Sequence, residues 1–588
     1  MLNRYFQDEL DFFRDLSREF AREHPTLAPA LAEASSDPDV ERILEGTAFL
    51  TAAVRQKLED DLPELTQTLL QMLWPHYLRP VPSTTIVEFG HPSRAKISGR
   101  ELLPRSDVQI DSVPVDGTPC RFRTSYDVAF RPLRIASAQI EPEGRGRLRL
   151  GVEIMGGASL DDLALDSLRL YLHGDLPFAT SLYLWLMRHV SGVALECADE
   201  GRTRRVELPR HPSPLRAVGF AEDEALLPYP KHSFPGYRLL QEYFTLPQKF
   251  LFVDVTGLDA LASLAPTERF DLVFQFDERP PDGMRVAPDN IRLHCTPVVN
   301  LQERDAEPIR LDQKRSSYLV RPDDPEPSHL EVYSVDRVTG INPGTARRHV
   351  YPSFFAFRSG VAPESGAPTF YKLQRRNAVG VPNSSCYLSF VNAEEGGTVP
   401  EAEVVSIELT CTNRRLAEGL RPGDVCRHTE HSPQFAEFRN LLGITPSVLP
   451  PLEGGFHWRL ISHLSLNFVS LADAEALRSL LSLYDFAALH DRQAAMSTRR
   501  RLESIQGVET KPGERLFRGA AVRGVETTIQ LAEDRFSSDG EVFLFARLLE
   551  EFLSLYVTVN SFSQLTVVGT QKGERYEWPP RIGSQFTL

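Results

Sequence analysis

Two cysteines and two histidines form a group whose side chains could together bind a transition metal: Cys411, Cys426, His428 and His431. Zinc prefers such a ligand set of sulfur and imidazole. Zinc sites usually pair their cysteines about two to four residues apart, whereas these two cysteines are well separated and the histidines follow in an acidic stretch. The spacing therefore predicts a packed cysteine, a cysteine in a turn and two surface histidines, with no functional metal.

Possible general bases are present, but no enzymatic motif accompanies them. His189, His294 and His463 lie near apolar runs without a neighbouring nucleophile or orienting carboxylate, so we expect hydrogen-bonded, partly buried histidines. The sequence lacks the G-x-x-x-x-G-K-[ST], H-E-x-x-H, G-x-S-x-G and G-x-G-x-x-G patterns. Gly144-Arg145-Gly146 predicts only a hairpin turn. We expect no enzyme, no catalytic residue and no cofactor, although a hydrolase or metal-dependent enzyme with a site invisible in the sequence is an alternative.

The clusters of charged residues predict contacts with solvent or with a partner, and not a catalytic site. Adjacent residues on a helix point about 100° apart, so the pairs Asp60-Asp61 and Glu550-Glu551 predict a solvated face and not converging carboxylates. Arg499-Arg500-Arg501 could contact an anionic surface or a partner protein. The net charge of −15 repels phosphate backbones, which argues against a nucleic-acid partner.

Length and composition predict a large protein of several domains. With about 150 residues to a domain, 588 residues suggest about four structural units. Hydrophobic residues make up 41% and charged residues 25%, which is typical of a soluble globular protein. Six scattered cysteines indicate a reducing compartment, and no apolar stretch is long enough to span a membrane. We therefore expect a cytoplasmic protein without membrane insertion.

The first 83 residues have helical periodicity. Phe6, Leu10, Phe13, Leu16 and Phe20 recur at helical spacing, which predicts an amphipathic helix over residues 3–23. A second helix is expected to follow Asp37-Pro38 and a third to end at Trp74-Pro75. So many aromatic side chains exceed what one thin helical layer buries. We therefore predict that the stripe Phe6, Leu10, Phe13 and Phe20 binds a partner chain.

The rest of the chain predicts an α+β multidomain protein that is β-rich in the middle. Short apolar runs separated by proline and glycine begin at residue 84, and linkers are expected near 323–327 and 447–455. We divide the chain into a helical module (1–83), β-rich domains (84–325 and 326–450) and an α+β domain (451–588). In the last domain we expect helices at 472–483, 488–502 and 542–556, and strands at 525–531 and 564–568.

Several strings, in order along the chain, resemble one protein family. They are RYFQDEL (4–10), WPHYLRPVPS (74–83), YPKHSFPGYRLLQEYF (229–244), CTPVVNL (295–301), HWRLISHLSLN (457–467) and VNSFSQL (559–565). Together they resemble the TssF family of baseplate subunits in bacterial type VI secretion systems. The resemblance extends from the start of the chain nearly to its end.

The resemblance implies a non-enzymatic wedge subunit. In that family, two TssF copies and one TssG join TssK and TssE, and six such wedges surround the VgrG spike beneath a contractile sheath. The baseplate then docks on the membrane complex from the cytoplasm. Such use of one chain in two positions requires quasi-equivalent contacts. A wedge protein of an extracellular contractile injection particle is the alternative within the same class.

Overall fold

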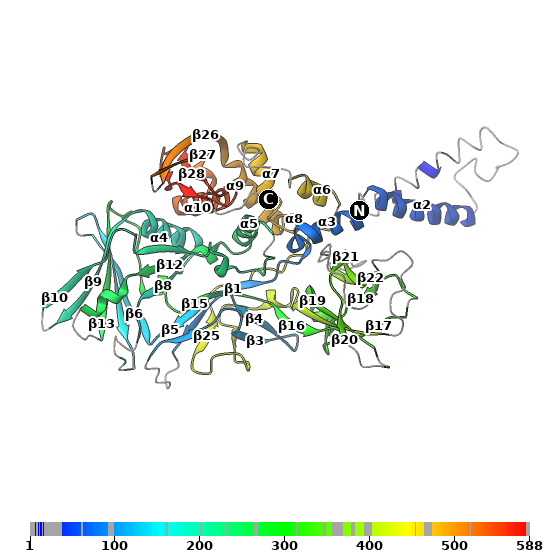
Figure 1. Cartoon of the computed structure of the whole chain (residues 1–588), viewed down its shortest axis with the longest axis horizontal. Helices are drawn as coiled ribbons and strands as arrows, with labels where there is room; N and C mark the ends of the chain where they lie inside the picture. Colours follow the sequence, from blue (N-terminus) through cyan, green and yellow to red (C-terminus); the bar gives the residue numbers. More distant parts are fainter. Residues whose placement is uncertain are drawn as a thin grey trace. The chain divides into compact units, whose positions relative to one another are not determined.

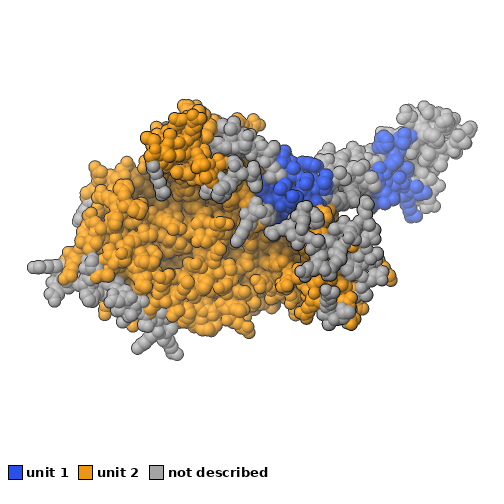
Figure 2. Space-filling model, in the orientation of Figure 1, with its two compact units in different colours: residues 1–78, 451–465 blue, residues 79–450, 466–588 orange. Residues whose placement is uncertain are grey.

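The structure, a computed structural model, describes most of the chain. The described residues are 6–7, 10, 12–14, 16, 38–59, 63–91, 99–142, 144–156, 158, 163–199, 202–230, 233–263, 268–312, 314–342, 344, 348–354, 369–377, 383–392, 403–452, 454–463, 473–517 and 519–583. The chain divides into two compact units (Figure 2): unit 1 comprises residues 1–78 and 451–465, and unit 2 comprises residues 79–450 and 466–588.

Unit 1 is helical and joins two distant parts of the sequence. It contains α2 (Pro38–Glu59), α3 (Pro63–Leu73), the short η2 (Pro75–Leu78) and α6 (Gly454–His463). Helices α3 and α6 pack together. Between them the Thr66 hydroxyl lies 3.1 Å from Nδ1 of His457, whose Nε2 lies 2.8 Å from the Pro451 carbonyl. A carbonyl only accepts, so Nε2–H donates to it and Nδ1 accepts from Thr66.

An antiparallel sheet of six strands runs through the centre of unit 2 (Figure 1). Its order is β24 (Val425–Arg427), β3 (Gln109–Val115), β4 (Thr118–Thr124), β15 (Cys295–Val299), β1 (Thr84–Gly90) and β25 (Glu437–Asn440). Asp116 and Gly117, both at positive φ (47° and 84°), join β3 to β4 in the conformation that a tight hairpin needs. The sheet takes strands from both segments that the sequence assigned to the β-rich middle.

Two further sheets of unit 2 contain the strands that precede α4 and follow α5 in the chain. One has the order β10 (Arg202–Glu207), β9 (Val190–Asp199), β13 (Arg269–Phe276), β7 (Arg147–Ile154), β6 (Leu133–Glu141). The other has the order β11 (Leu215–Val218), β12 (Phe252–Thr256), β8 (Ser167–Leu172), β14 (Ile291–Arg292). Helix α4 (Leu176–Arg188) follows β8, and α5 (Pro235–Thr245) leads through η4 (Pro247–Phe250) into β12.

A separate hydrophobic core forms around β23 (Val404–Thr412). That strand pairs with β19 (Glu331–Ile341), β16 (Gln302–Asp305) and β17 (Ile309–Arg310), and β19 also pairs with β20 (Arg348–Val350). Next to this sheet lie β18 (Tyr318–Leu319), β22 (Ser384–Asn392) and β21 (Thr369–Asn377). The short β2 (Glu101–Leu103) pairs with β5 (Val128–Phe130).

The C-terminal part of unit 2 is α+β. Strands β27 (Ala520–Leu531) and β28 (Ser561–Gly569) are parallel and are joined by α10 (Asp539–Ser554). The sheet continues on one side with β26 (Ile505–Phe517) and on the other with β29 (Arg575–Glu577) and β30 (Arg581–Ile582). Helices α7 (Ala474–Ser482), α8 (Ala487–His490) and α9 (Arg492–Glu503) precede it.

The structure confirms the predicted α+β class with a β-rich middle. Helices α2, α3, α7 and α10 and strands β27 and β28 occur where the sequence predicted them, with ends that differ by a few residues. The helix predicted over 488–502 begins at Arg492, because Asp491 caps it by accepting from the Gln493 N–H at 2.9 Å. In the described parts, no helix is long and apolar enough to cross a membrane.

Candidate interaction surfaces

Exposed large apolar side chains concentrate in unit 1. Half of those among the described residues belong to it, although it is much the smaller unit. They are Phe12, Leu16, Ile43, Phe49, Leu50, Leu65, Met72 and Trp458. Exposed apolar surface of this kind marks a site where proteins associate.

Helix α2 turns its bulky side chains outward. Ile43 and Leu50, seven residues apart and therefore on one face, are 68% and 67% exposed, whereas Ala48 and Ala52 are fully buried. An amphipathic helix usually packs its large apolar side chains inward. The structure buries the small residues instead, which leaves an apolar face on α2 open for a partner.

The stripe predicted on the first helix is only partly described. Phe6, Leu10 and Phe13 are helical, and Phe20 lies outside the described residues. Leu10 is buried, with 9% exposed, and Phe6 and Phe13 are half-buried. The neighbouring Phe12, with its ring centre 5.9 Å from that of Phe13, is the exposed aromatic residue of this turn. Partner binding by the four predicted residues stays a prediction.

The cysteines and histidines considered as metal ligands lie in different surroundings. Cys411 is buried in the core around β23, whereas Cys426 is exposed on the edge strand β24. The His428 ring lies 4.8 Å from that of Phe438, and its Nε2 lies 3.1 Å from the Ala436 carbonyl. Within the described parts of the chain, no three His, Cys, Asp or Glu side chains gather as a metal site.

The histidines considered as bases are committed to structural contacts. His294 is buried, and its Nε2 accepts from the Arg131 backbone N–H at 3.2 Å, while burial lowers the pKa of the imidazole to about 3. His189 follows α4, stacks on Trp185 at 4.4 Å and places Nδ1 3.1 Å from Asp277. Only the helical backbone of His463 is described.

The prediction of a solvated Glu550-Glu551 pair is wrong. Arg547 and Arg581 bind both carboxylates, with closest distances of 2.9 Å from Arg581 to Glu550 and 2.6 Å from Arg581 to Glu551. Glu550 is only 3% exposed. The same two arginines, one within α10 and one on β30, therefore bridge the two carboxylates. Asp60-Asp61 lies outside the described residues.

The arginine run at the end of α9 divides between surface and interior. Arg499 is exposed and pairs with Glu503 at 2.8 Å. Arg501 is mostly buried and binds Glu541 of α10 at 2.8 Å. One member of the run therefore stabilises the fold, which sequence reasoning missed because Glu541 lies forty residues further along the chain.

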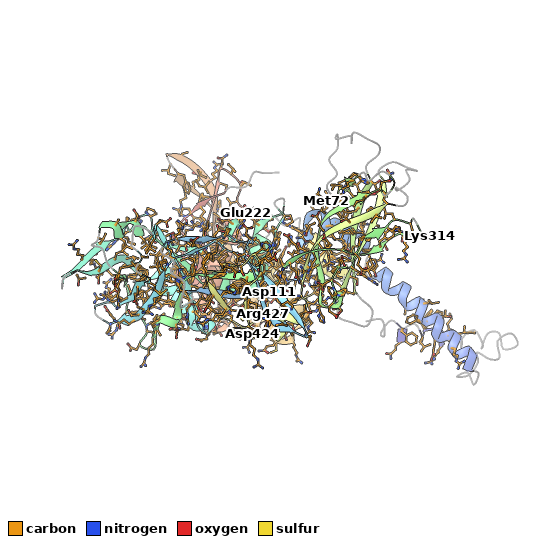
Figure 3. The ribbon with its side chains drawn as sticks, turned by 90° about the horizontal axis from the view of Figure 1, so that it is seen from below. Met72, Asp111, Glu222, Lys314, Asp424 and Arg427 are labelled. Carbon is orange, nitrogen blue, oxygen red and sulfur yellow. The ribbon has the colours of Figure 1, made fainter. Side chains whose placement is uncertain are left out.

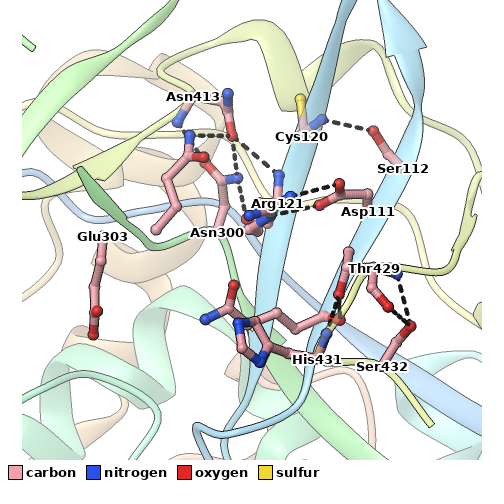
Figure 4. Close-up of polar contacts among 12 residues, drawn as sticks. Asp111, Ser112, Cys120, Arg121, Asn300, Glu303, Asn413, Thr429, His431 and Ser432 are labelled. Atoms are coloured by element: carbon pink, nitrogen blue, oxygen red, sulfur yellow. Dashed lines mark hydrogen bonds and ion pairs between the residues drawn. The ribbon is translucent and has the colours of Figure 1, made fainter. Parts of the chain in front are cut away.

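Buried amides connect the central sheet to Asn413, the residue that follows β23. The Asn413 side-chain oxygen accepts from Asn300 at 2.8 Å and from Gln302 at 3.3 Å, and the Asn413 backbone N–H donates to Asn300 at 2.7 Å (Figure 4). Beside them Arg121 binds Asp111 through two bonds of 2.9 and 3.0 Å. Asp111 lies with Asp424 and Arg427 at the β3–β24 edge (Figure 3). These contacts hold the strands of this region together.

A buried ion pair organises the segment that carries YPKHSFPGYRLLQEYF. Lys249 and Glu242 are fully buried and bind each other. Glu242 also accepts from the backbone N–H groups of Leu226 and Leu227 at 2.8 and 3.0 Å, and Lys249 donates to the Glu224 carbonyl at 3.0 Å. The contacts of Glu242 within this motif therefore connect the loop before α5 to η4.

Comparisons with known proteins place the chain in a family. A family model described as Type VI secretion system, TssF matches residues 1–585. The Pseudomonas aeruginosa protein named type VI secretion system component TssF1 is 32% identical over 630 residues, which cover 99% of each chain.

Two solved structures are similar over nearly the whole chain. One is a chain from the cryo-electron microscopy structure of the type VI secretion TssK-TssF-TssG baseplate subcomplex, with a TM-score of 0.76, 31% identity and coverage of 93% of this chain and 99% of that one. The other is from the baseplate complex of the type VI secretion system, with a TM-score of 0.65, 28% identity and full coverage of both. This chain therefore belongs to the TssF family of type VI secretion systems.

Proposed function

We propose that the chain is a structural subunit of the type VI secretion baseplate wedge. The exposed apolar face of unit 1 carries the proposal, because exposed apolar surface of this kind marks a site of protein association. The similarity to a chain of a TssK-TssF-TssG subcomplex supports TssG and TssK as partners. The buried pairs and amide contacts of unit 2 give it the rigidity of a scaffold.

Membership of the TssF family supports the finer assignments of this proposal. The chain occurs as two copies beside one TssG and assembles with TssK and TssE around the VgrG spike, where the wedges nucleate the contractile tail. The completed baseplate lies in the cytoplasm, docked on the membrane complex. No catalytic step belongs to this role.

Copurification tests the role and the surface together. The full chain is coexpressed with TssG and TssK, and the mass of the purified complex is measured. We expect a fixed stoichiometry in the parent, and at least a tenfold loss of bound TssG in Leu50→Asp, because a carboxylate in an apolar contact is costly. Leu50 is 67% exposed, so the free chain should melt at the parent's temperature.

The matched control is Leu516→Asp. Leu516 is also apolar and is 78% exposed, but it lies on β26 of unit 2. It should retain TssG as the parent does. If Leu50→Asp binds TssG as well as the control does, the α2 face is not the interface; if the parent binds neither partner, the proposed function is wrong.

A further inference from the structure

A cavity of about 780 Å³ opens in unit 2 where the C-terminal part meets the β-rich part. Helices α4, α5 and α10 contribute to its wall, together with β11 and the segment from β29 to β30. Its size suits several side chains of a bound segment. One wall is aromatic: the Phe543 and Trp578 rings stack with centres 5.9 Å apart.

Three side chains that line this cavity have an unused hydrogen-bond donor. The Tyr183 hydroxyl, Nε of Arg238 and Nε of Arg547 are buried and have no hydrogen-bond partner among the residues described. Tyr183 is fully buried and Arg238 is 2% exposed. A buried donor without an acceptor is unfavourable, and three around one cavity indicate a ligand rich in acceptor oxygens.

The charges around the cavity also favour an anionic ligand. Two lining acids are already occupied: Glu551 by Arg547 and Arg581, and Glu224 by the Gly219 and Ala221 backbone N–H groups. Arg216 reaches only to 3.9 Å from Glu224.

Three further exposed residues complete the charge balance, and one of them, Glu577, is already paired with Arg575 at 3.3 Å. Arg188, at the end of α4, is exposed and makes no ion pair with any described residue. On the acidic side, Glu222 is also exposed. The uncommitted charge at the cavity is therefore mainly cationic.

We propose that this cavity binds an acidic segment of a partner polypeptide, whose carboxylate and carbonyl oxygens accept from Tyr183, Arg238 and Arg547. Arg188 and Arg216 meet the charge of the segment at the mouth of the cavity, and its apolar side chains lie on the aromatic wall. The inference rests on the proposed function, because the partner is another chain of the same assembly. It concerns unit 2 and is separate from the α2 face of unit 1.

Photo-cross-linking in the purified complex with TssG and TssK tests the proposal. Met187, which lines the cavity, is replaced by p-benzoylphenylalanine; the matched control replaces Met496, an exposed methionine outside the lining. We expect position 187 to cross-link to a partner segment that contains Asp or Glu. In the Arg188→Glu/Arg216→Glu variant the yield should fall at least tenfold, and a Lys substitution of the cross-linked acid should restore it.

Arg492→Glu is the control for general charge effects, because Arg492 is exposed on α9 and does not line the cavity. A complex that forms normally but gives no cross-link at position 187, or one to a segment without acids, overturns this inference and leaves the proposed function intact. A thermal shift with inorganic phosphate without a cross-link assigns the cavity to a small anion and also overturns it. If no complex forms, the proposed function fails first and this inference fails with it.

Discussion

At the scale of single residues, buried polar contacts explain most of what the sequence left open. Arg131 and His294 are 163 residues apart, yet the Arg131 N–H donates to the His294 imidazole. No local pattern reveals such a contact, so the sequence predicted a hydrogen-bonded histidine without its partner. The same limit applies to Glu550, whose bridging arginine Arg581 lies on β30. What could be predicted was the kind of residue, and what could not was the partner that tertiary packing supplies.

Glu550 makes the stability of the chain depend on pH. Burial raises the pKa of this carboxyl from 4.5 to about 7, in spite of Arg547, and the Glu551 charge adds to the rise. Between these values the folded chain binds a proton that the unfolded chain has lost, so the free energy of unfolding falls as the pH rises from about 4.5 to about 7.

The Glu550→Gln variant removes this titration. Relative to the parent, its melting temperature should therefore be higher at pH 8 than at pH 5, as measured by differential scanning fluorimetry in matched buffers. Glu574→Gln, which changes an exposed carboxylate near β29, is the control and should show the same difference at both values. An equal effect of pH on both variants would contradict the assignment.

The Lys249–Glu242 pair predicts a large cost for removing one partner. Lys249→Met leaves the Glu242 carboxylate buried with only the backbone N–H groups of Leu226 and Leu227, which should lower stability by about 3–5 kcal/mol. Urea unfolding monitors the loss. The double variant Lys249→Met/Glu242→Gln should be less destabilised than the single one, since it buries no unpaired charge; a double variant at least as unstable would refute the ion-pair explanation.

At the scale of elements, the pattern of apolar residues predicted the elements that are buried. It missed an exposed strand that is held mainly by its hydrogen bonds to a neighbouring strand. Helix α10 has apolar residues on more than one face, and it packs on α4, α5 and β28, as expected of a covered helix. Strand β26 was not predicted, because it is largely exposed and contains Pro512 and Gly513. Strand β26 is held in place by its pairing with β27, which extends from Ile505 to Phe517. Pro512 also lacks the N–H that a further strand would need, which protects this edge.

Phe552 tests the core around α10. The ring is fully buried, with centres 5.3 Å from Tyr556 and 6.1 Å from Phe234. Phe552→Ala should cost about 3–5 kcal/mol, because the cavity cannot be filled by its ring neighbours without moving α5. The melting temperature of the full chain reports the loss. An unchanged melting temperature together with lost baseplate assembly would make Phe552 an interface residue.

At the scale of the whole molecule, the two units should respond separately to mutation. Leu460 of α6 is 1% exposed inside unit 1. A carboxylate there has no place in the helical core, so Leu460→Asp should unfold unit 1 and leave the unfolding transition of unit 2 in place. Calorimetry of the full chain measures both transitions. Met72→Asp, at a site that is 57% exposed on α3, is the control and should leave both unchanged; a single shared transition would mean that the units are not independent.

Unit 1 is formed by two parts of the chain that are far apart in the sequence. This sets an order of events during protein synthesis. Helix α3 leaves the ribosome early, but its partner α6 ends at His463. At about 5–20 residues per second, α3 waits roughly 20–80 s for the helix that covers it. The surface that we assign to partner binding is therefore completed only after the central sheet of unit 2 has been translated. Nascent chains that stop before α6 cannot present a finished unit 1, so we expect incomplete subunits to be excluded from the baseplate.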